Sequence, residues 1–250
     1  MSNSKVLGYV AYEGPSLFDG RPIAVIINRL DGSDNAKTGA IVQSFIIRTD
    51  INPVGAIKTG KDKSVCGDCI HRPLLAKKTG AAPCYVQVGK SVLSVYRAYR
   101  RGRYVRATPE QIGALLAGKV LRIGTYGDPA MAPVEVWQRL VVHVAGHRGY
   151  SHQWQQPWFD HASWSSLVMA SVDSVAERDD AKALGMRTFR VSLGVSKKPK
   201  EATCPASAEG GRRITCADCV LCSGTKIVAN DVVIADHAVG FKNRVFFKVA

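Results

Sequence analysis

The second half of the chain alternates between segments typical of strands and segments typical of helices. Val120–Gly127 and Val168–Ser174 are apolar strand-like runs, whereas Pro133–Ala145 has helical spacing, and Pro109–Gly118 is a further predicted helix with Thr108 as its N-cap. This alternation predicts parallel strands joined by crossover helices. With about four or five such units, we expect an α/β fold, a full or partial (β/α) barrel of mainly parallel strands. A doubly wound open sheet is the alternative.

The first 60 residues have a different character. Pro22–Asn28 and Ile41–Arg48 are β-branched runs separated by turn-forming residues, which is the pattern of strands. We therefore expect residues 1–60 to be an N-terminal β-rich segment packed on the core. Residues 61–250 would then form the barrel-like domain with its cysteine-rich loops, and the two parts would make one structural unit.

Several predicted strands end in polar residues. In (β/α) barrels the functional side chains lie at the carboxyl ends of the strands. The candidate catalytic residues at these positions are Asp128, His152, Gln153 and Asp173. Two candidate cofactor-binding residues on the same grounds are Ser174 and Arg190. For each of them, a capping role or a hydrogen bond in the core is the alternative.

The most specific motif is the downstream cysteine group, which we define as Cys204, Cys216, Cys219 and Cys222. Three thiolates at three-residue spacing can surround one metal centre, and the Cys-Pro upstream of them can supply a fourth ligand. The pattern resembles the ligand run of ferredoxin-type iron–sulfur sites, with the remote cysteine placed before the triplet instead of after it. It predicts a [4Fe–4S] cluster, and zinc is the alternative.

The upstream cysteine group is Cys66, Cys69 and Cys84, in the stretches CGDCIHR and PCYV. Two interpretations compete. With His71 as a fourth ligand, the group would close a structural zinc site. Without it, three cysteines would hold a second [4Fe–4S] cluster with one open iron, at which S-adenosylmethionine can bind and be cleaved reductively.

Basic residues outnumber acidic ones, with 34 Lys and Arg against 20 Asp and Glu, for a formal net charge of +14. A charge of this sign favours polyanions, so nucleic acid is a candidate partner. Five arginines interleave with tyrosines in one segment, which suits phosphates and unstacked bases. These candidate nucleic-acid-binding residues are Arg97, Arg100, Arg101, Arg103 and Arg106. The alternative is a solvated helix end whose tyrosines pack on the core.

The sequence also bears on location. Its apolar runs, such as Ile23–Ile27, are too short to cross a bilayer, and MSNSKVLGYV lacks the apolar region of a secretory signal. We therefore expect a cytoplasmic protein without a membrane partner. In a reducing cytoplasm, cysteines serve as metal ligands or catalytic thiols more often than as disulfides.

Several motifs between about Asp31 and Thr225 together resemble an uncharacterised family of bacteriophage-encoded cysteine-rich proteins. They are CGDCIHR … PCYV, RIGTYGDPA, GYSHQW, ASVDS and CPAS … CADCVLCSG. That family is similar to radical S-adenosylmethionine proteins and other iron–sulfur barrels. The resemblance implies an iron–sulfur protein with a barrel-like core, found in the host cytoplasm. The spacing of the upstream cysteines in this chain, C-x2-C-x14-C, differs from the C-x3-C-x2-C that is usual in radical S-adenosylmethionine proteins. Tyr85 beside Cys84 matches the aromatic position of that pattern, which makes Tyr85 a candidate cofactor-binding residue.

Two functional hypotheses follow from the sequence. The first is a phage-type iron–sulfur protein that performs radical S-adenosylmethionine-like chemistry or electron transfer with an external reductant. The second is a basic nucleic-acid-binding protein whose cysteines hold structural zinc or structural clusters. Iron and acid-labile sulfide in the purified protein would distinguish the first from a zinc protein.

Overall fold

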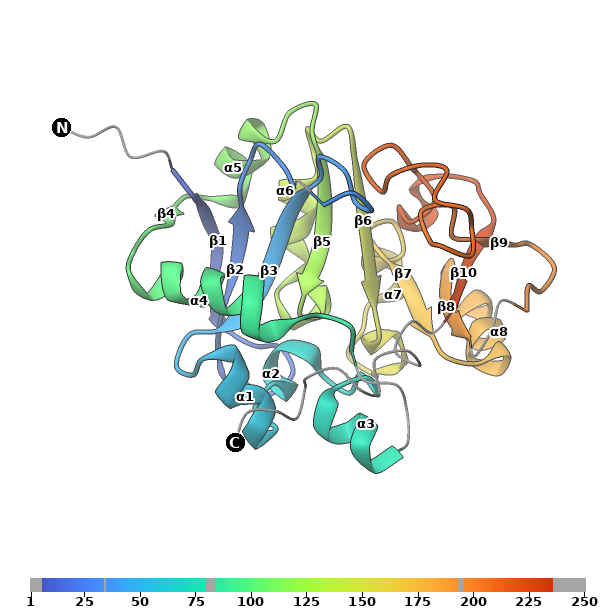
Figure 1. The fold of residues 1–250 in the computed structure, drawn as a ribbon, viewed down its shortest axis with the longest axis horizontal. Helices are drawn as coiled ribbons and strands as arrows, with labels where there is room; N and C mark the ends of the chain where they lie inside the picture. The colour runs from blue at the N-terminus through green and yellow to red at the C-terminus, as the bar shows by residue number, and fades with distance from the viewer. Residues whose placement is uncertain (1–5, 34, 80–83, 193–195, 236–250) are drawn as a thin grey trace.

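A computed structural model describes residues 6–33, 35–79, 84–192 and 196–235. Its framework is one sheet of ten strands in the order β4-β1-β2-β3-β5-β6-β7-β8-β10-β9 (Figure 1). The strands are β1 Gly8–Pro15, β2 Pro22–Asn28, β3 Val42–Arg48, β4 Val105–Arg106, β5 Val120–Tyr126, β6 Gly146–Ser151, β7 Met169–Val172, β8 Thr188–Ser192, β9 Glu201–Thr203 and β10 Asp231–Ala235.

Strand direction divides this sheet into two parts. β1, β2 and β3 form an antiparallel meander, and β4 lies parallel to β1 at the edge. From β3 onward, every neighbouring pair is parallel. The N-terminal strands and the strand–helix units therefore share one sheet, and the carboxyl ends of β3 and β5 to β10 lie on the same edge.

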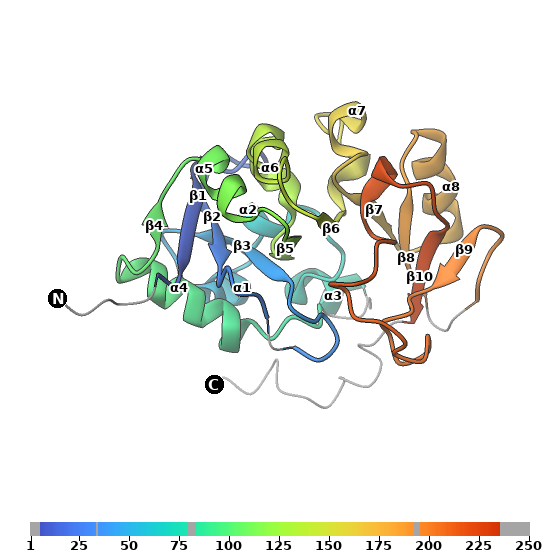
Figure 2. The same cartoon turned by 90° about the horizontal axis from the view of Figure 1, so that it is seen from above.

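Short helices connect the strands. They are α1 Pro53–Thr59, α2 Lys63–Cys66, α3 Pro73–Thr79, α4 Leu93–Arg100, α5 Pro109–Leu115, α6 Val134–Leu140, α7 His161–Trp164 and α8 Val175–Ala183. A π turn, Val88–Val92, precedes α4, and 3-10 turns cover Pro129–Met131, Gln153–Gln155 and Gly224–Lys226. Figure 2 shows α5 to α8 on one side of the sheet and α4 on the other. No helix in the described part of the chain has both the length and the apolar character that a bilayer crossing requires.

The local sequence explains most of these elements. The five residues Ile23–Ile27 of β2 are fully buried, as expected of a central strand covered on both faces. α5 begins at the predicted N-cap, where the Thr108 side chain accepts from the backbone N–H of Gln111 in a capping box. The predicted helix Pro133–Ala145 ends early, at Leu140, and residues 141–145 form an irregular turn that leads into β6.

The α/β class and the mainly parallel sheet agree with the sequence-based prediction. Closure into a barrel is not shown: among the described residues, the pairing runs from β4 to β9 and does not join these two outer strands. The sheet therefore has a clear carboxyl edge on its parallel side. Figure 1 shows α2 and α3 beyond the arrowheads of β5 and β6 at that edge.

Candidate metal centres

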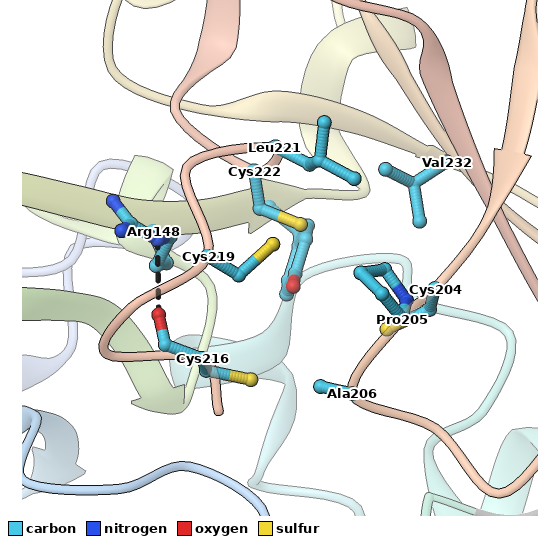
Figure 3. A pocket seen from close by; sticks show the side chains of 10 residues that line it. Arg148, Cys204, Pro205, Ala206, Cys216, Cys219, Leu221, Cys222 and Val232 are labelled. Atoms are coloured by element: carbon cyan, nitrogen blue, oxygen red, sulfur yellow. Dashed lines mark hydrogen bonds between the residues drawn. The ribbon is translucent and has the colours of Figure 1, made fainter. Parts of the chain in front are cut away.

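The downstream cysteine group converges in space. The four cysteines line one pocket together with Arg148, Tyr150, Pro205, Ala206, Leu221 and Val232. Figure 3 shows the sulfur atoms of Cys216, Cys219 and Cys222 on one side of this pocket and Cys204 across from them. The structure therefore brings Cys204 and the triplet to one pocket, and their role as metal ligands stays a prediction.

The fold fixes both arms of this pocket. Cys204 follows β9, and its backbone N–H donates to the carbonyl of Val233 in β10 (2.9 Å). The triplet lies in the irregular stretch before β10, where the N–H of Cys216 donates to the carbonyl of Lys37 (3.2 Å) and the carbonyl of Cys222 accepts from the N–H of Gly149 (3.2 Å). Main-chain bonds to three separate segments thus position the thiols.

Arg148 supports the triplet from β6. This guanidinium is 5% exposed and donates to the carbonyls of Cys216 (3.1 Å) and Ala217 (3.3 Å) and to the hydroxyl of Ser223 (3.1 Å). Burial lowers its pKa from the ordinary value for arginine, and the nearby cysteines oppose that shift. A cation held this close offsets the negative charge that several thiolates bring together.

Hydrogen bonds reach the sulfur atoms as well. The Tyr150 hydroxyl donates to the sulfur of Cys222, and the backbone N–H of Ala206 donates to the sulfur of Cys204. Burial nevertheless raises the pKa of Cys204, and it raises that of Cys222 to about 12. These thiols would therefore be neutral in isolation, and a bound metal would supply the positive charge that holds them as thiolates.

Sulfur spacing distinguishes one metal ion from a cluster. Four sulfurs on a single zinc ion, each at about 2.3 Å from the metal, lie only about 3.8 Å apart. Among the described residues, no three cysteine sulfurs all approach within 4.8 Å of one another. The irons of a cubane cluster would hold their thiolates farther apart, and neither cysteine group has three sulfurs at zinc spacing among the described residues.

The upstream cysteine group lies in the crossover from β3 to β5. Cys66 is the last residue of α2, the N–H of Cys69 donates to the carbonyl of Cys66 (3.3 Å), and the N–H of Cys84 donates to the carbonyl of His71 (2.7 Å). Burial raises the pKa of all three thiols, and the charge of Cys84 raises those of Cys66 and Cys69 further. The three thiols are therefore close enough to interact electrostatically.

Sulfur-directed N–H groups recur in this group. The backbone N–H of His71 donates to the sulfur of Cys69, and that of Val86 donates to the sulfur of Cys84. In each case the donor lies two residues after the cysteine, the same offset as Ala206 after Cys204. Such bonds favour the thiolate over the thiol, which is the form that binds metal.

A buried arginine fixes the loop that carries Cys66 and Cys69. The Arg72 guanidinium forms a two-point ion pair with Asp62 (3.0 and 2.9 Å) and donates to the carbonyls of Gly60 (2.8 Å) and Gly67 (3.2 Å). This fork joins both ends of α2 to the start of α3. The loop geometry is consequently set before any ligand arrives.

The four candidate catalytic residues gather around this loop. Asp128, after β5, accepts from the Ser151 hydroxyl (2.8 Å), the His152 N–H (2.7 Å) and the Gln153 amide (3.4 Å). The same Gln153 amide donates to the carbonyl of Cys66 (3.3 Å). Burial raises the pKa of Asp128 to about 6, against the lowering effect of its hydrogen bonds. Asp128 and Gln153 thus tie the strand ends to the cysteine loop.

His152 and Asp173 lie beside the same loop but contact His71. The Nε2 atom of His71 lies 2.8 Å from Oδ1 of Asp173, and Nε2 of His152 lies 3.9 Å from Oδ2 of the same carboxylate. The Nε2 atom of His71 therefore faces Asp173, and the predicted zinc site with three cysteines and His71 stays a prediction. Burial lowers the pKa of His152 to about 4, so its imidazole is neutral.

The other candidate cofactor-binding residues have local partners. Ser174 is the N-cap of α8 and accepts from the N–H of Glu177 (3.0 Å), while Arg190 forms a buried two-point ion pair with Glu201 (2.7 and 2.6 Å). Tyr85 is 55% exposed, and its hydroxyl accepts from Arg122 (3.0 Å). Of the three, Tyr85 alone remains placed to contact a ligand, since it adjoins Cys84.

The arginine-rich segment has an internal structural role. The Arg106 guanidinium forms two hydrogen bonds with Glu13 (3.2 and 2.8 Å), and Arg100 donates to the carbonyl of Thr49 (3.0 Å). Tyr104 is buried, and Tyr99 packs against the core and donates to Glu13. This packing of Tyr99 and Tyr104 is what the packing alternative for this segment expects, and nucleic-acid binding stays a prediction. Arg97, Arg101 and Arg103 are exposed.

Sequence reasoning missed the residues that support the two cysteine groups. Arg148 and Tyr150 are two apart in β6 and so share one face of the sheet, the face toward Cys222. A charged residue inside an otherwise buried strand was the available signal. For Arg72 and Arg122 no sequence signal distinguishes them from the many surface cations.

Comparison of the chain with protein-family models, with curated proteins and with solved structures finds no match in any of the three. The resemblance of the cysteine motifs to a phage family therefore stays a prediction.

Proposed function

We propose that the protein binds a [4Fe–4S] cluster at the downstream cysteine group. The observation that carries this proposal is the convergence of four thiols, separated by up to 18 positions in the sequence, on one pocket. The flanking cation of Arg148 and the hydrogen bonds to the sulfurs of Cys204 and Cys222 support it.

The upstream cysteine group is the second part of the proposal. Its three thiols would hold another [4Fe–4S] cluster, and the Nε2 atom of His71 beside this group lies 2.8 Å from Asp173. Three protein ligands leave one iron accessible, and this iron supplies reductive cleavage of S-adenosylmethionine when the cluster is bound. The exposed Tyr85 adjoins this group, and Gln153 fixes its position through the carbonyl of Cys66.

The location of the upstream group supports an enzymatic role. It lies at the carboxyl ends of the parallel strands, where open α/β sheets place their ligands. The downstream group instead lines a pocket with Arg148 and Tyr150, which are within β6. We therefore assign chemistry to the upstream group and electron supply to the downstream group, with an external reductant.

Metal analysis of the full chain, purified without oxygen, tests the cluster proposal. We expect a brown protein with about four iron and four sulfide ions per chain for one cluster, and about eight of each for two. The variants Cys219→Ser and Cys69→Ser each control for the other, because each should remove one cluster and leave the other. A colourless protein with stoichiometric zinc would contradict the proposal.

The enzymatic part has its own assay. With dithionite as electron donor and S-adenosylmethionine added, the wild-type protein should form 5′-deoxyadenosine and methionine. Cys69→Ser should abolish this product although the downstream cluster is retained. A protein with both clusters intact and no 5′-deoxyadenosine would refute the open-iron assignment and leave electron transfer as its function.

A further inference from the structure

A second kind of metal-binding geometry lies next to the upstream cysteine group. His71, His152 and Asp173 come from three separate segments: the cysteine loop, the end of β6 and the end of β7. One ligand atom from each lies within 4.8 Å of the others, and no other such trio of His, Cys, Asp or Glu occurs in the described ranges. The two imidazole rings are 5.6 Å apart and nearly edge to face, at 68°.

One of these three ligand atoms has no hydrogen-bond partner. The Nε2 atom of His152 is buried and has no hydrogen-bond partner, although its carboxylate neighbour is only 3.9 Å away. Buried polar atoms in native proteins nearly always have a hydrogen-bond partner, so an unpaired one calls for a physical reason. A cation between the three residues would give this nitrogen a partner.

The surroundings favour a dication. Two contacts hold Asp173 in place. Its backbone N–H donates to the Glu177 carboxylate (2.6 Å), and its own carboxylate lies 2.8 Å from Nε2 of His71. Asp128 and Asp173 both act electrostatically on the sulfur of Cys69, which places two carboxylates on this side of the loop. All three ligand side chains are partly buried, at 17–23% exposed, so ions can still enter from solvent.

We propose that His71, His152 and Asp173 bind a divalent transition-metal ion, separate from the cysteine clusters. Two imidazoles and one carboxylate form the ligand set that open mononuclear sites use for Fe²⁺, Mn²⁺ or Zn²⁺. Three protein ligands leave coordination positions for water or substrate. The site adjoins the upstream cysteine group at the carboxyl edge, so a substrate bound there would contact both centres.

Manganese is the probe that separates this site from the cysteines, because Mn²⁺ prefers nitrogen and oxygen ligands and binds thiolates poorly. The full chain, purified without oxygen, is titrated with Mn²⁺, and the six-line EPR signal of the free ion is followed. An oxidised [4Fe–4S] cluster is EPR-silent and does not interfere. We expect the wild-type protein to bind a single Mn²⁺ per chain.

His152→Ala and Asp173→Asn should each weaken Mn²⁺ binding at least about tenfold. His143→Ala and Asp179→Asn change an exposed histidine and an exposed aspartate elsewhere, and should bind as the wild type does. Circular dichroism melting and the iron content at the downstream group verify that each variant is folded. Absence of a bound Mn²⁺ in folded wild-type protein, or unchanged binding in His152→Ala, would overturn the proposal.

A variant with Cys66, Cys69 and Cys84 all changed to Ser makes the two proposals distinguishable. It should lose the upstream cluster and keep the Mn²⁺ site. If the cysteines bind no cluster at all, the Mn²⁺ titration still reports on the histidines and the carboxylate. Loss of Mn²⁺ binding in a folded cysteine variant would refute an independent site.

Discussion

Replacing Arg148 by Met should destabilise the downstream cysteine group more than any other single change outside the cysteines. Arg148→Met keeps the length of the side chain and removes its charge and its donors. Three bonds to the segment of Cys216, Ala217 and Ser223 would be lost, leaving buried and partly buried acceptors without these partners. Bonds from charged donors contribute about 1.5–3 kcal/mol each, but neighbouring bonds are not additive, so we expect a loss of about 3–5 kcal/mol.

The assay measures stability and metal retention together. Urea unfolding followed by circular dichroism gives the free energy of unfolding, and loss of iron to a chelator under anaerobic conditions gives the stability of the cluster. The matched control is Arg139→Met, since Arg139 is exposed and pairs only with the exposed Glu110 (2.9 Å). That pair should contribute less than about 1 kcal/mol. Equal stability and equal iron loss in the two variants would refute the role assigned to Arg148.

Three further predictions test the fold around the two sites. Burial lowers the pKa of His147 to about 4, below its unfolded value of 6.5. Between these two pKa values the folded state therefore binds fewer protons than the unfolded state. The free energy of unfolding present above pH 6.5 should fall by about 3 kcal/mol as the pH drops to 4. Urea titrations should show a smaller fall in His147→Gln, and an equal fall would exclude this histidine as the cause. Gly67 has φ +56°, and a Cβ there would lie 2.2 Å from the Gln153 amide oxygen. Gly67→Ala should lower the free energy of unfolding by about 1–3 kcal/mol and reduce the iron content of the upstream group. The control Gly20→Ala has a similar positive φ and no neighbour within 4 Å, so it reports backbone strain without a clash. Equal losses of unfolding free energy in the two variants would disprove the steric argument. Thr108→Ala removes the cap of α5 and should lower the free energy of unfolding by about 1 kcal/mol, and an unchanged midpoint in thermal melting would contradict the capping role.

Local patterns predicted the elements that short-range physics controls. The run Pro22–Asn28 forms β2 with the predicted bounds, and Thr108 caps α5 as its sequence indicates. Both depend on residues adjacent in the chain, through β-branched side chains in one case and a side-chain-to-backbone bond in the other. The spacing of Cys216, Cys219 and Cys222 is local in the same sense, since residues so close must approach one another.

The sequence by itself therefore determined the α/β class and the parallel strands, and it predicts the ligand chemistry of the cysteines. Only the tertiary structure decided which distant groups meet. It brought Cys204 across from the triplet, placed Arg148 behind it, and turned His71 toward Asp173 and His152. These contacts arise from the order of strands in the sheet, because strands that are neighbours in space align side chains that lie far apart in the chain, and no local preference records that order.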